Sequence, residues 1–477
     1  MWTSINQALN IIDNFVWGVP LMVLIIAGGL LLTIRLGLLQ IRKLPLALKW
    51  MLQNEEGGKG EISSFSALCT ALSATIGTGN IVGVATAVCA GGPGALFWMV
   101  VAAFLGMATK YSEGLLAVKY RTVAEDGHSL GGPFYYIELG MGKNFKWLAK
   151  IFAFFGVCVG LFGIGTFSQV NGISSAVHGF FDPNDAFTVK ILPFLGEYSW
   201  SVVIASLILS FCVAAVLIGG VKRIASVSQI IVPFMAVIYF VFAVILICCN
   251  ITKVPAAFAT IVTAAFSPKA ITGGAVGSML IAMQKGVARG IFSNEAGLGS
   301  APIAAAAAQT NSPVRQGLVS MTGTFIDTII ICTLTGLSIV LTGAWQVEGL
   351  EGVQVTTYAF QHGLPFPAQF SSFILMLCLV FFAFTTILGW DYYSERCLEY
   401  LSGGNMKHVK IFRWIYILAV FIGPYMTVSA VWTIADIFNG LMAIPNMIAL
   451  FALSGVIVKE TRAFFQHAKE EARAEHR

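Results

Sequence analysis

Long apolar segments recur along the whole chain and alternate with short segments that hold most of the charged residues. An apolar helix of about 18 or more residues is long enough to cross the roughly 30 Å hydrocarbon layer of a membrane. The pattern therefore predicts an all-α membrane protein with eleven spanning helices. Their predicted ranges are 15–35, 63–89, 95–119, 148–177, 200–219, 228–250, 271–308, 316–343, 370–395, 411–431 and 434–458.

Two of the predicted spans are interrupted by glycine and polar residues. The second span contains IGTGNIVG (76–83), and the seventh contains FSNEAGLGS (292–300). Glycine weakens a helix by about 1 kcal/mol relative to alanine, and unpaired polar groups in hydrocarbon cost several kcal/mol. Such backbone is tolerated at membrane depth where it lines a cavity or binds a ligand. For the second span, close helix packing through Gly79 and Gly83 is the structural alternative.

The two interrupted helices open two blocks of five spans each. The first block occupies 63–250 and the second occupies 251–458. Residues 1–62 form an extra span and a segment expected on the cytoplasmic membrane surface, and 459–477 form a charged tail expected to be a short helix. Because each block has an odd number of spans, the two blocks have opposite orientations. Broken helices at corresponding positions of inverted halves point to a transporter site near the bilayer midplane.

Composition and charge agree with this interpretation. The 477 residues are 57% hydrophobic and 11% charged, with a mean hydropathy of +0.82, whereas soluble domains hold about 25% charged residues. The net charge of +5 is spread over many short loops, so nucleic acid is not an expected partner. Lys and Arg collect in alternate loops, which places the N-terminus outside and the C-terminus in the cytoplasm. We expect a multi-pass protein of the cell inner (plasma) membrane.

No enzyme motif accompanies the spans. The sequence contains no HExxH, GxSxG or Walker A motif, and its nine cysteines lack CxxC spacing. We therefore expect neither an enzyme nor an ATP-driven pump, and no organic cofactor. An ion channel is the alternative of a different class, because glycine-rich re-entrant backbone also forms selectivity filters. An H⁺-coupled transporter of another small solute is the second alternative.

Five sequence blocks resemble those of the alanine or glycine:cation symporter family, the sodium:alanine symporters. Val100 departs from this resemblance, since the family's FWM run is expected to continue with Trp. The resemblance implies the leucine-transporter fold, with ten core helices in two inverted repeats of five. It also implies import of alanine or glycine driven by Na⁺, and leaves open the choice between alanine, glycine and serine. The blocks are GTGNIVGVATA (77–87), GGPGALFWMVVAAFLG (91–106), GGPFYYIELGMG (131–142), RGIFSNEAGLGSAP (289–302) and LGWDYYSERCLEYL (388–401).

A zwitterionic amino acid needs separate partners for its carboxylate and its ammonium group. Backbone amides freed at the first interruption, near the positive end of a half-helix dipole, suit the carboxylate. Thr78 and Gly79 are the candidates for this role. Asn80 is a candidate side-chain ligand for the substrate or the cation. The alternative for Asn80 is a cap on the second half-helix.

The resemblance adds three candidate substrate residues. It favours Gln169 in the fourth span as a substrate contact, where the alternative is a bridge between helices. It presents Phe292 as a gate that closes over the substrate, with core or lipid packing as the alternative. It presents Trp390 as a wall that limits the size of the side chain, with the interfacial aromatic belt as the alternative.

A Na⁺ site is implied where the broken second span meets the ninth span. In the leucine-transporter fold, which this chain resembles, a Na⁺ site joins these two helices. Carried over to this sequence, its ligands are the carbonyls of Ser73, Ile76 and Phe382 and the hydroxyls of Thr385 and Thr386. The alternative for each threonine is a hydrogen bond from its hydroxyl to a carbonyl of its own helix.

The carboxylates Glu295, Asp327 and Glu113 lie inside predicted spans, where a charge costs at least about 2.5–3.5 kcal/mol on insertion scales. Glu295 is expected either to stabilise the unwound segment or to couple transport to the cation. Asp327 is expected to form an ion pair. Lys285 and Arg289 are the candidate partners of these two carboxylates, and the third, Glu113, is expected to pair with Lys110 or another base.

Overall fold

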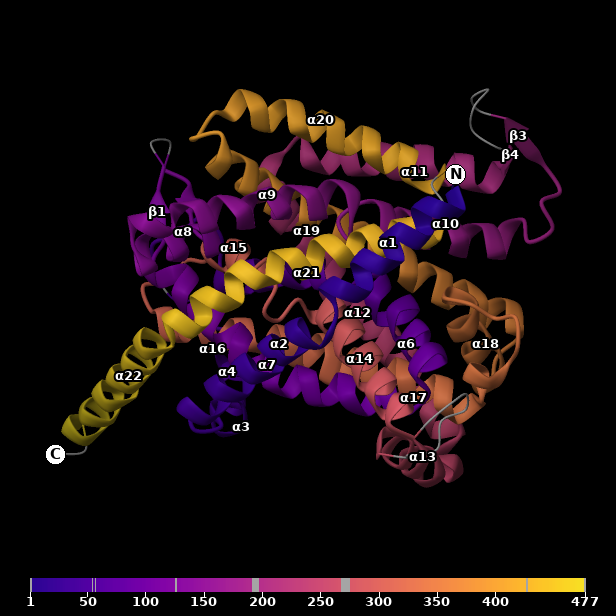
Figure 1. The fold of residues 1–477 in the computed structure, drawn as a ribbon, viewed down its shortest axis with the longest axis horizontal. Helices are drawn as coiled ribbons and strands as arrows, with labels where there is room; N and C mark the ends of the chain where they lie inside the picture. Colours follow the sequence, from indigo (N-terminus) through magenta and orange to yellow (C-terminus); the bar gives the residue numbers. More distant parts are fainter. Residues whose placement is uncertain are drawn as a thin grey trace.

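Helices make up most of the chain, as the hydropathy pattern predicts (Figure 1). The computed structural model describes residues 2–53, 55, 57–124, 127–190, 197–266, 275–425 and 428–475. In these ranges the strands are limited to two antiparallel ribbons in loops, which the sequence did not predict. They pair β1 (Thr122–Val123) with β2 (Ser129–Leu130), and β3 (Thr188–Lys190) with β4 (Glu197–Ser199).

The N-terminal segment, the first predicted block and the beginning of the second block form a series of helices up to residue 266. Its elements are α1 (Trp2–Val16), α2 (Val19–Arg35), α3 (Leu39–Arg42), α4 (Leu44–Met51), α5 (Ser64–Thr75), η1 (Gly79–Gly83), α6 (Val84–Gly91), α7 (Gly94–Lys119), α8 (Pro133–Tyr135), η2 (Tyr136–Met141), η3 (Lys143–Phe145), α9 (Lys146–Phe162), α10 (Phe167–Phe181), α11 (Trp200–Leu217), α12 (Gly220–Cys249), η4 (Ile251–Lys253) and α13 (Val254–Phe266).

The rest of the second predicted block runs from α14 to the first turn of α22, and α22 continues into the tail. Its elements are α14 (Ala275–Asn294), α15 (Ala301–Ala305), α16 (Pro313–Thr324), η5 (Phe325–Cys332), α17 (Thr333–Thr342), η6 (Ala344–Gln346), α18 (Val353–Gly363), α19 (Ala368–Leu401), α20 (Met406–Ile422), η7 (Gly423–Tyr425), α21 (Val428–Ala452) and α22 (Ser454–Glu475).

Eight helices in the described part of the chain are long and apolar enough to cross a membrane, or nine if the bent pair α5 and η1–α6 counts as one span. The two other predicted spans correspond to α14 and to α20, which has 17 residues. The count of eleven therefore stays a prediction. The predicted start of the seventh span at residue 271 lies outside the described residues. The predicted helical tail is confirmed, since α22 runs to Glu475.

Both predicted interruptions are confirmed. Between Thr75 and Gly79 the chain leaves the helix, and the two halves of the second span are bent by 51°. In the seventh span α14 ends at Asn294 and α15 begins only at Ala301. The connecting segment holds Glu295 with φ +57°, a left-handed conformation that costs a residue with a side chain about 1–3 kcal/mol.

A third interruption lies in the fourth span and was not predicted. Helix α9 ends at Phe162 and α10 begins at Phe167. The Tyr416 hydroxyl donates to the carbonyl of Gly165 at 2.8 Å, which gives the freed backbone a partner. A side chain at Gly165 would lie 2.7 Å from the Cβ of Trp390. The close approach of α19 therefore requires glycine here, and the sequence GIGT was the local signal.

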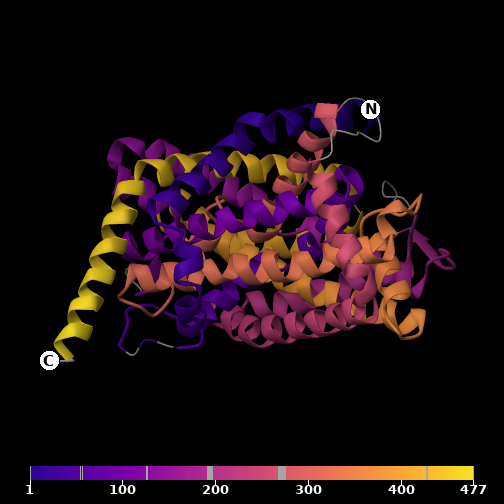
Figure 2. The ribbon, with the colours of Figure 1, turned by 90° about the horizontal axis from the view of Figure 1, so that it is seen from below.

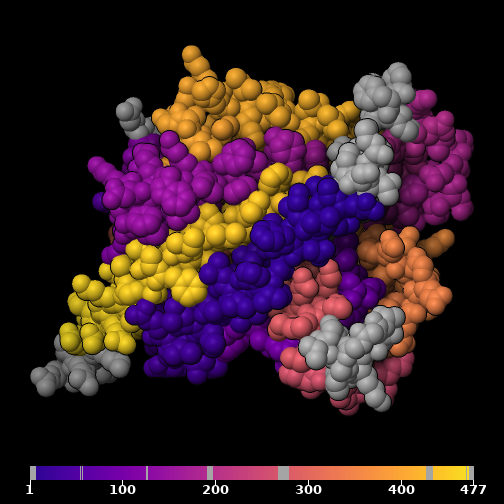
Figure 3. All heavy atoms as spheres, viewed as in Figure 1, coloured from indigo at the N-terminus to yellow at the C-terminus, as the bar shows by residue number. Residues whose placement is uncertain are grey.

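The extra N-terminal span lies on the outside of the bundle. Helices α1 and α2 (indigo) run beside α21 (yellow) on the face seen in Figure 3, and α2 also packs on α7. Helix α22 projects away from the body at one end, as the two perpendicular views show (Figures 1 and 2). The broken second and seventh spans are covered by these surrounding helices, so their polar residues lie inside the protein.

Candidate functional site

The two interruptions lie side by side in the interior. A side chain at Gly79 would meet Ser293 Cα at 3.2 Å and the Phe292 ring at 3.3 Å. The close packing expected as the structural alternative therefore exists at Gly79. Every residue predicted for the substrate and Na⁺ sites is buried, which places all of them away from the lipid surface.

Asn80 closes the first interruption and ties it to the eighth span. Its side-chain oxygen accepts from the amide of Gly77 at 2.9 Å, so it caps backbone that precedes it and not the second half-helix. Its amide nitrogen donates to the Asp327 carboxylate at 2.7 Å and to the Asp327 carbonyl at 3.2 Å. In this conformation both ends of the Asn80 side chain are occupied by protein groups.

Asp327 connects the two interruptions. Besides Asn80, its carboxylate accepts from the Ser293 hydroxyl at 2.9 Å and from the Thr328 hydroxyl at 2.7 Å. The ion pair expected for Asp327, with Lys285 or Arg289 as candidate partner, is not formed among the described residues. Arg289 donates instead to Asp436 through two bonds of 2.6 and 2.9 Å, because α21 brings that carboxylate alongside α14. We call the set Asn80, Asp327, Ser293 and Thr328 the central network.

Glu295 stabilises the unwound segment of the seventh span. Its carboxylate accepts from the Ser300 hydroxyl at 2.6 Å, which closes the segment on itself. It also accepts from the indole nitrogen of Trp390 at 2.8 Å. Trp390 has 1% of its surface exposed, so the interfacial aromatic belt is excluded as its position. The first of the two roles expected for Glu295 is therefore present.

Helix α7 holds the same segment through two charged side chains. The Lys110 ammonium donates to the carbonyl of Asn294 at 2.8 Å. The Glu113 carboxylate accepts from the amide of Gly297 at 3.1 Å and from the Asn446 side chain at 2.6 Å. The predicted pairing of Glu113 with Lys110 or another base is not found as an ion pair among the described residues. Both side chains bind the unwound backbone instead, whose freed groups need partners.

Three of the residues proposed for Na⁺ meet at one point. The Thr386 hydroxyl lies 3.3 Å from the Ile76 carbonyl, across the first interruption, and 3.0 Å from the Phe382 carbonyl. The Thr385 hydroxyl bonds to carbonyls of its own helix at 3.0 and 3.1 Å and touches the Met235 sulfur. Ser73 is buried on α5, one turn before the interruption. Both threonine hydroxyls therefore bond to carbonyls of their own helix, as the alternative interpretation expected. Of the two, Thr386 also contacts the broken second span.

Gln169 and Thr78 form a second contact across the first interruption. The amide of Thr78 donates to the Gln169 side-chain oxygen at 3.0 Å, so Gln169 bridges two helices as the alternative interpretation expected. The Thr78 hydroxyl is buried and has no hydrogen-bond partner within the described ranges. Such an orphaned group costs free energy, which a bound ligand would recover.

Phe292 lies between the first interruption and a buried ion pair. Its ring is 1% exposed and contacts Gly79 on one side. On the other side, the Arg289 guanidinium carbon is 5.4 Å from the ring centroid, and that guanidinium binds Asp436. Lipid-facing packing is therefore excluded for Phe292. Core packing, the other alternative, is present, because Phe292 belongs to the main hydrophobic core; its role as a gate stays a prediction.

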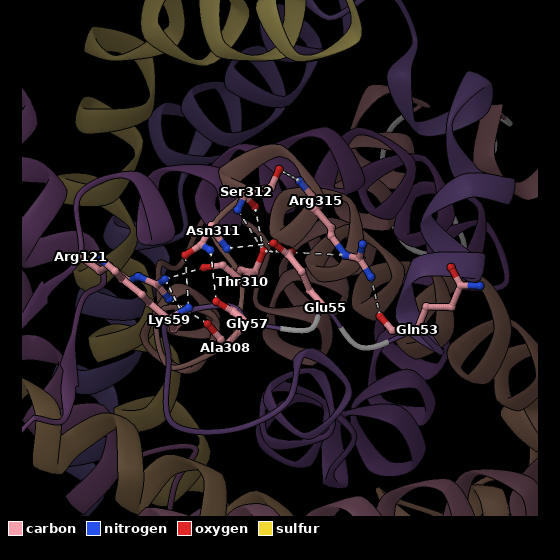
Figure 4. Close-up of polar contacts among 10 residues, drawn as sticks. All are labelled: Gln53, Glu55, Gly57, Lys59, Arg121, Ala308, Thr310, Asn311, Ser312 and Arg315. Carbon is pink, nitrogen blue, oxygen red and sulfur yellow. Dashed lines mark hydrogen bonds and ion pairs between the residues drawn. The ribbon is translucent and has the colours of Figure 1, made fainter. Parts of the chain in front are cut away.

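A polar cluster joins loops at one end of the bundle (Figure 4). Arg121, just after α7, donates to four backbone carbonyls at 2.5–3.2 Å. Glu55 accepts from Thr310 and Asn311, and its carboxylate lies 3.7 Å from Arg315. The carbonyl groups bound by Arg121 belong to Lys59, Ala306, Ala308 and Thr310. We call this the loop latch, because it holds residues before the second span against residues after the seventh.

The whole chain matches a family model. The model for the sodium:alanine symporter family covers residues 2–477. This chain belongs to the sodium:alanine symporter family. Among its relatives, the sodium/alanine symporter AgcS of Methanococcus maripaludis is 46% identical over 472 residues, which cover 98% of each protein. An uncharacterized transporter of Haemophilus influenzae is 55% identical over 467 residues, covering 98% of this chain and 97% of that protein.

The fold of this sodium:alanine symporter family member is similar to that of another protein whose structure has been solved. The crystal structure of MhsT in complex with L-phenylalanine matches 85% of this chain and 93% of that chain, with a TM-score of 0.57 and 12% sequence identity. The leucine-transporter fold implied by the sequence blocks is thus confirmed. The chain is an amino-acid:cation symporter embedded in the membrane, and it is not an enzyme.

Sequence reasoning about this symporter found the interruptions but missed most of what holds them. It identified Asn80 and Glu295, and it placed Asp327 in the wrong pair. It missed Ser293 as a partner of Asp327, and Lys110 as a partner of the unwound backbone. The available signal was a hydroxyl directly before Asn and Glu in FSNEAG, and a lysine in the apolar third span.

Proposed function

We propose that this symporter imports a small neutral amino acid, alanine or glycine, together with Na⁺. The observation that carries the proposal is the cluster of neutral oxygens between the first interruption and α19. Unwound backbone carbonyls in discontinuous helices are characteristic Na⁺ ligands in transporters. The proposed ligand set is the carbonyls of Ser73, Ile76 and Phe382 and the hydroxyls of Thr385 and Thr386.

The substrate carboxylate is assigned to the start of the second half-helix. The unpartnered Thr78 hydroxyl and the amide of Gly79 are the proposed donors, since a helix N-terminus favours an anion. Asn80 and Gln169 are proposed to line this position. In this conformation the side-chain oxygens of Asn80 and Gln169 accept hydrogen bonds from the backbone amides of Gly77 and Thr78. Substrate and Na⁺ would therefore replace these hydrogen bonds when they bind.

The small size of the substrate is supported by the packing around the first interruption. Gly79 already touches Phe292, and a side chain at Gly77 would lie 2.5 Å from the Thr386 hydroxyl. We assign Phe292 as the gate and Trp390 as the wall that limits substrate size. The name of the relative AgcS, a sodium/alanine symporter, agrees with a substrate of this size.

Uptake by purified protein in proteoliposomes tests the proposal. Radiolabelled alanine and glycine are supplied with an inward Na⁺ gradient, an inward H⁺ gradient in Na⁺-free buffer, or neither. We expect saturable uptake with the Na⁺ gradient, and competition by unlabelled alanine but not by leucine. Uptake driven by H⁺ alone would overturn Na⁺ coupling and move the coupling role to Glu295. Conductance without saturable uptake would favour the channel alternative.

We also propose that the protein lies in the plasma membrane, with its N-terminus outside the cell and its C-terminus in the cytoplasm. The last turns of α2 and α7 and the first turns of α22 lie on the side that holds the loop latch. Arg35 at the end of α2 bonds to Ser454, and Lys119 at the end of α7 pairs with Glu460. This side carries the excess of Lys and Arg, as cytoplasmic loops do. A C-terminal reporter that functions only in the cytoplasm is expected to be active, and an inactive reporter would reverse the assignment.

A further inference from the structure

A cavity lies where the first span ends and α22 begins. Its volume is about 420 Å³. Four of its lining residues are basic, and of the described residues that line it none is acidic. The basic residues are Arg35, Arg42, Lys43 and Arg462. None of the four takes part in an ion pair within the described part of the chain, so their positive charges are not neutralised by protein carboxylates.

A tight turn brings these charges together. The amide of Gly37 donates to the Ile34 carbonyl at 3.0 Å, and the amide of Leu38 donates to the Thr33 carbonyl at 2.9 Å. This is the Schellman arrangement that ends a helix, and Gly37 has the positive φ of +63° that it requires. The chain therefore turns directly after α2, and Arg42 at the end of α3 reaches back to donate to the Gly37 carbonyl at 3.3 Å.

Helix α22 completes the cavity from the other end of the sequence. The Arg35 guanidinium donates to the Ser454 hydroxyl at 2.5 Å, which joins the end of α2 to the start of α22. The Lys43 ammonium lies 4.2 Å from the centroid of the Phe465 ring. Figure 3 shows this neighbourhood of the indigo N-terminal and yellow C-terminal segments. The cavity is thus built by groups from both termini of the chain.

The cavity is located at the membrane–water boundary. The first candidate span ends at Arg35, and the span before α22 ends at Ala452. Beside the cavity, apolar side chains are exposed on the protein surface: Ile34 by 68%, Leu38 by 46% and Ile41 by 57%. A ligand with an anionic head group and apolar chains would neutralise the basic residues of the cavity and cover the exposed apolar side chains beside it. Basic pockets at this depth bind anionic lipid head groups in membrane proteins.

We propose that this cavity binds the phosphate of an anionic phospholipid, with the acyl chains on Ile34, Leu38 and Ile41. A free inorganic phosphate offers the same charge chemistry but leaves the apolar residues uncovered. The site lies apart from the central network and from the proposed substrate and Na⁺ positions. The proposal therefore adds a lipid ligand to the transporter and does not depend on which amino acid or ion it carries.

Native mass spectrometry of the purified full-length protein in detergent tests the site. The probes are phosphatidylglycerol, phosphatidylcholine and inorganic phosphate, each titrated separately. The test variant is Arg42→Gln/Lys43→Gln/Arg462→Gln, which leaves Arg35 in place because it bonds to Ser454. The matched control is Lys222→Gln/Lys407→Gln/Lys410→Gln, which removes three exposed basic residues from the first turns of α12 and α20, on the same predicted side.

We expect one phosphatidylglycerol to bind at least tenfold more tightly than phosphatidylcholine, and the test variant to lose this preference while the control keeps it. Equal binding of the two lipids, or an unchanged preference in the test variant, would overturn the proposal. Displacement of phosphatidylglycerol by millimolar phosphate would replace the lipid with a free anion as the ligand. Should the triple variant fail to fold, Arg42→Gln and Arg462→Gln alone are each expected to weaken phosphatidylglycerol binding, and wild-type binding in both would refute the site.

Discussion

Replacing Thr386 by valine removes one hydroxyl from the proposed Na⁺ site and keeps the shape of the side chain. Loss of one hydrogen-bond-like contact to a charged group costs about 1.5–3 kcal/mol. The Na⁺-free protein also loses a partner of the Ile76 carbonyl, a neutral bond that contributes about 0.5–1.5 kcal/mol. The midpoints of these two ranges differ by about 1.25 kcal/mol, so the Na⁺ concentration for half-maximal uptake should rise about eightfold.

The neighbouring threonine supplies the control. Thr385 is equally buried, yet its hydroxyl bonds to its own helix and touches Met235, without reaching Ile76. Initial rates of alanine uptake are measured against Na⁺ concentration for wild type, Thr385→Val and Thr386→Val. We expect the larger shift in Thr386→Val, with alanine affinity at saturating Na⁺ nearly unchanged. A larger shift in Thr385→Val would contradict the geometry, and unshifted curves in both variants would refute the site.

Three other substitutions test the remaining assignments. Asn80→Ala leaves the Gly77 amide without its side-chain partner and removes one of the hydrogen bonds to the Asp327 carboxylate, which keeps those from Ser293 and Thr328. We therefore expect at least tenfold weaker alanine transport by correctly inserted protein, and normal apparent affinity would return Asn80 to a purely structural role. Trp390→Ala should let leucine or methionine compete for uptake, and unchanged selectivity would show that Trp390 is no wall. Arg121→Gln removes charged donors from four carbonyls of the loop latch, so hydrogen exchange at 57–62 and 306–310 should accelerate, and unchanged protection would mean that backbone pairing alone holds these loops.

The sequence predicted features that depend on local composition. Apolar length gave the spans, and glycine next to polar residues gave the interruptions near Gly79 and Glu295, because each costs helix stability wherever it occurs. The same rule extends to GIGT in the fourth span. There the break was missed because the surrounding apolar residues preserve a span of sufficient length, even though Gly165 is required by the approach of Trp390.

The choice of partners was beyond local rules. Arg289 lies closer in sequence to Asp327 than to Asp436, but the fold places the Asp436 carboxylate at 2.6 and 2.9 Å from the Arg289 guanidinium. Asn80 finds its partner 247 residues away, at Asp327. The loop latch has no signal in composition, since Arg121 binds carbonyl groups, which every residue carries. These contacts depend on tertiary packing, and the pattern of residue types contains no information on it.

The central network, together with the bonds from α7 to the unwound seventh span, has a mechanical consequence for transport. Four bonds with ionisable or charged side chains join the second, third, seventh and eighth spans: Asn80–Asp327, Ser293–Asp327, Lys110–Asn294 and Glu113–Gly297. Breaking all four would cost on the order of 6–12 kcal/mol, against a total barrier of about 16 kcal/mol for ten turnovers per second. The transport cycle is therefore expected to move these four spans together as one rigid body. Thr386 of α19 and Gln169 of α10 each contact the second span through a single hydrogen bond. At these two points a bound ion and a bound solute would reversibly join the four moving spans to the rest of the protein.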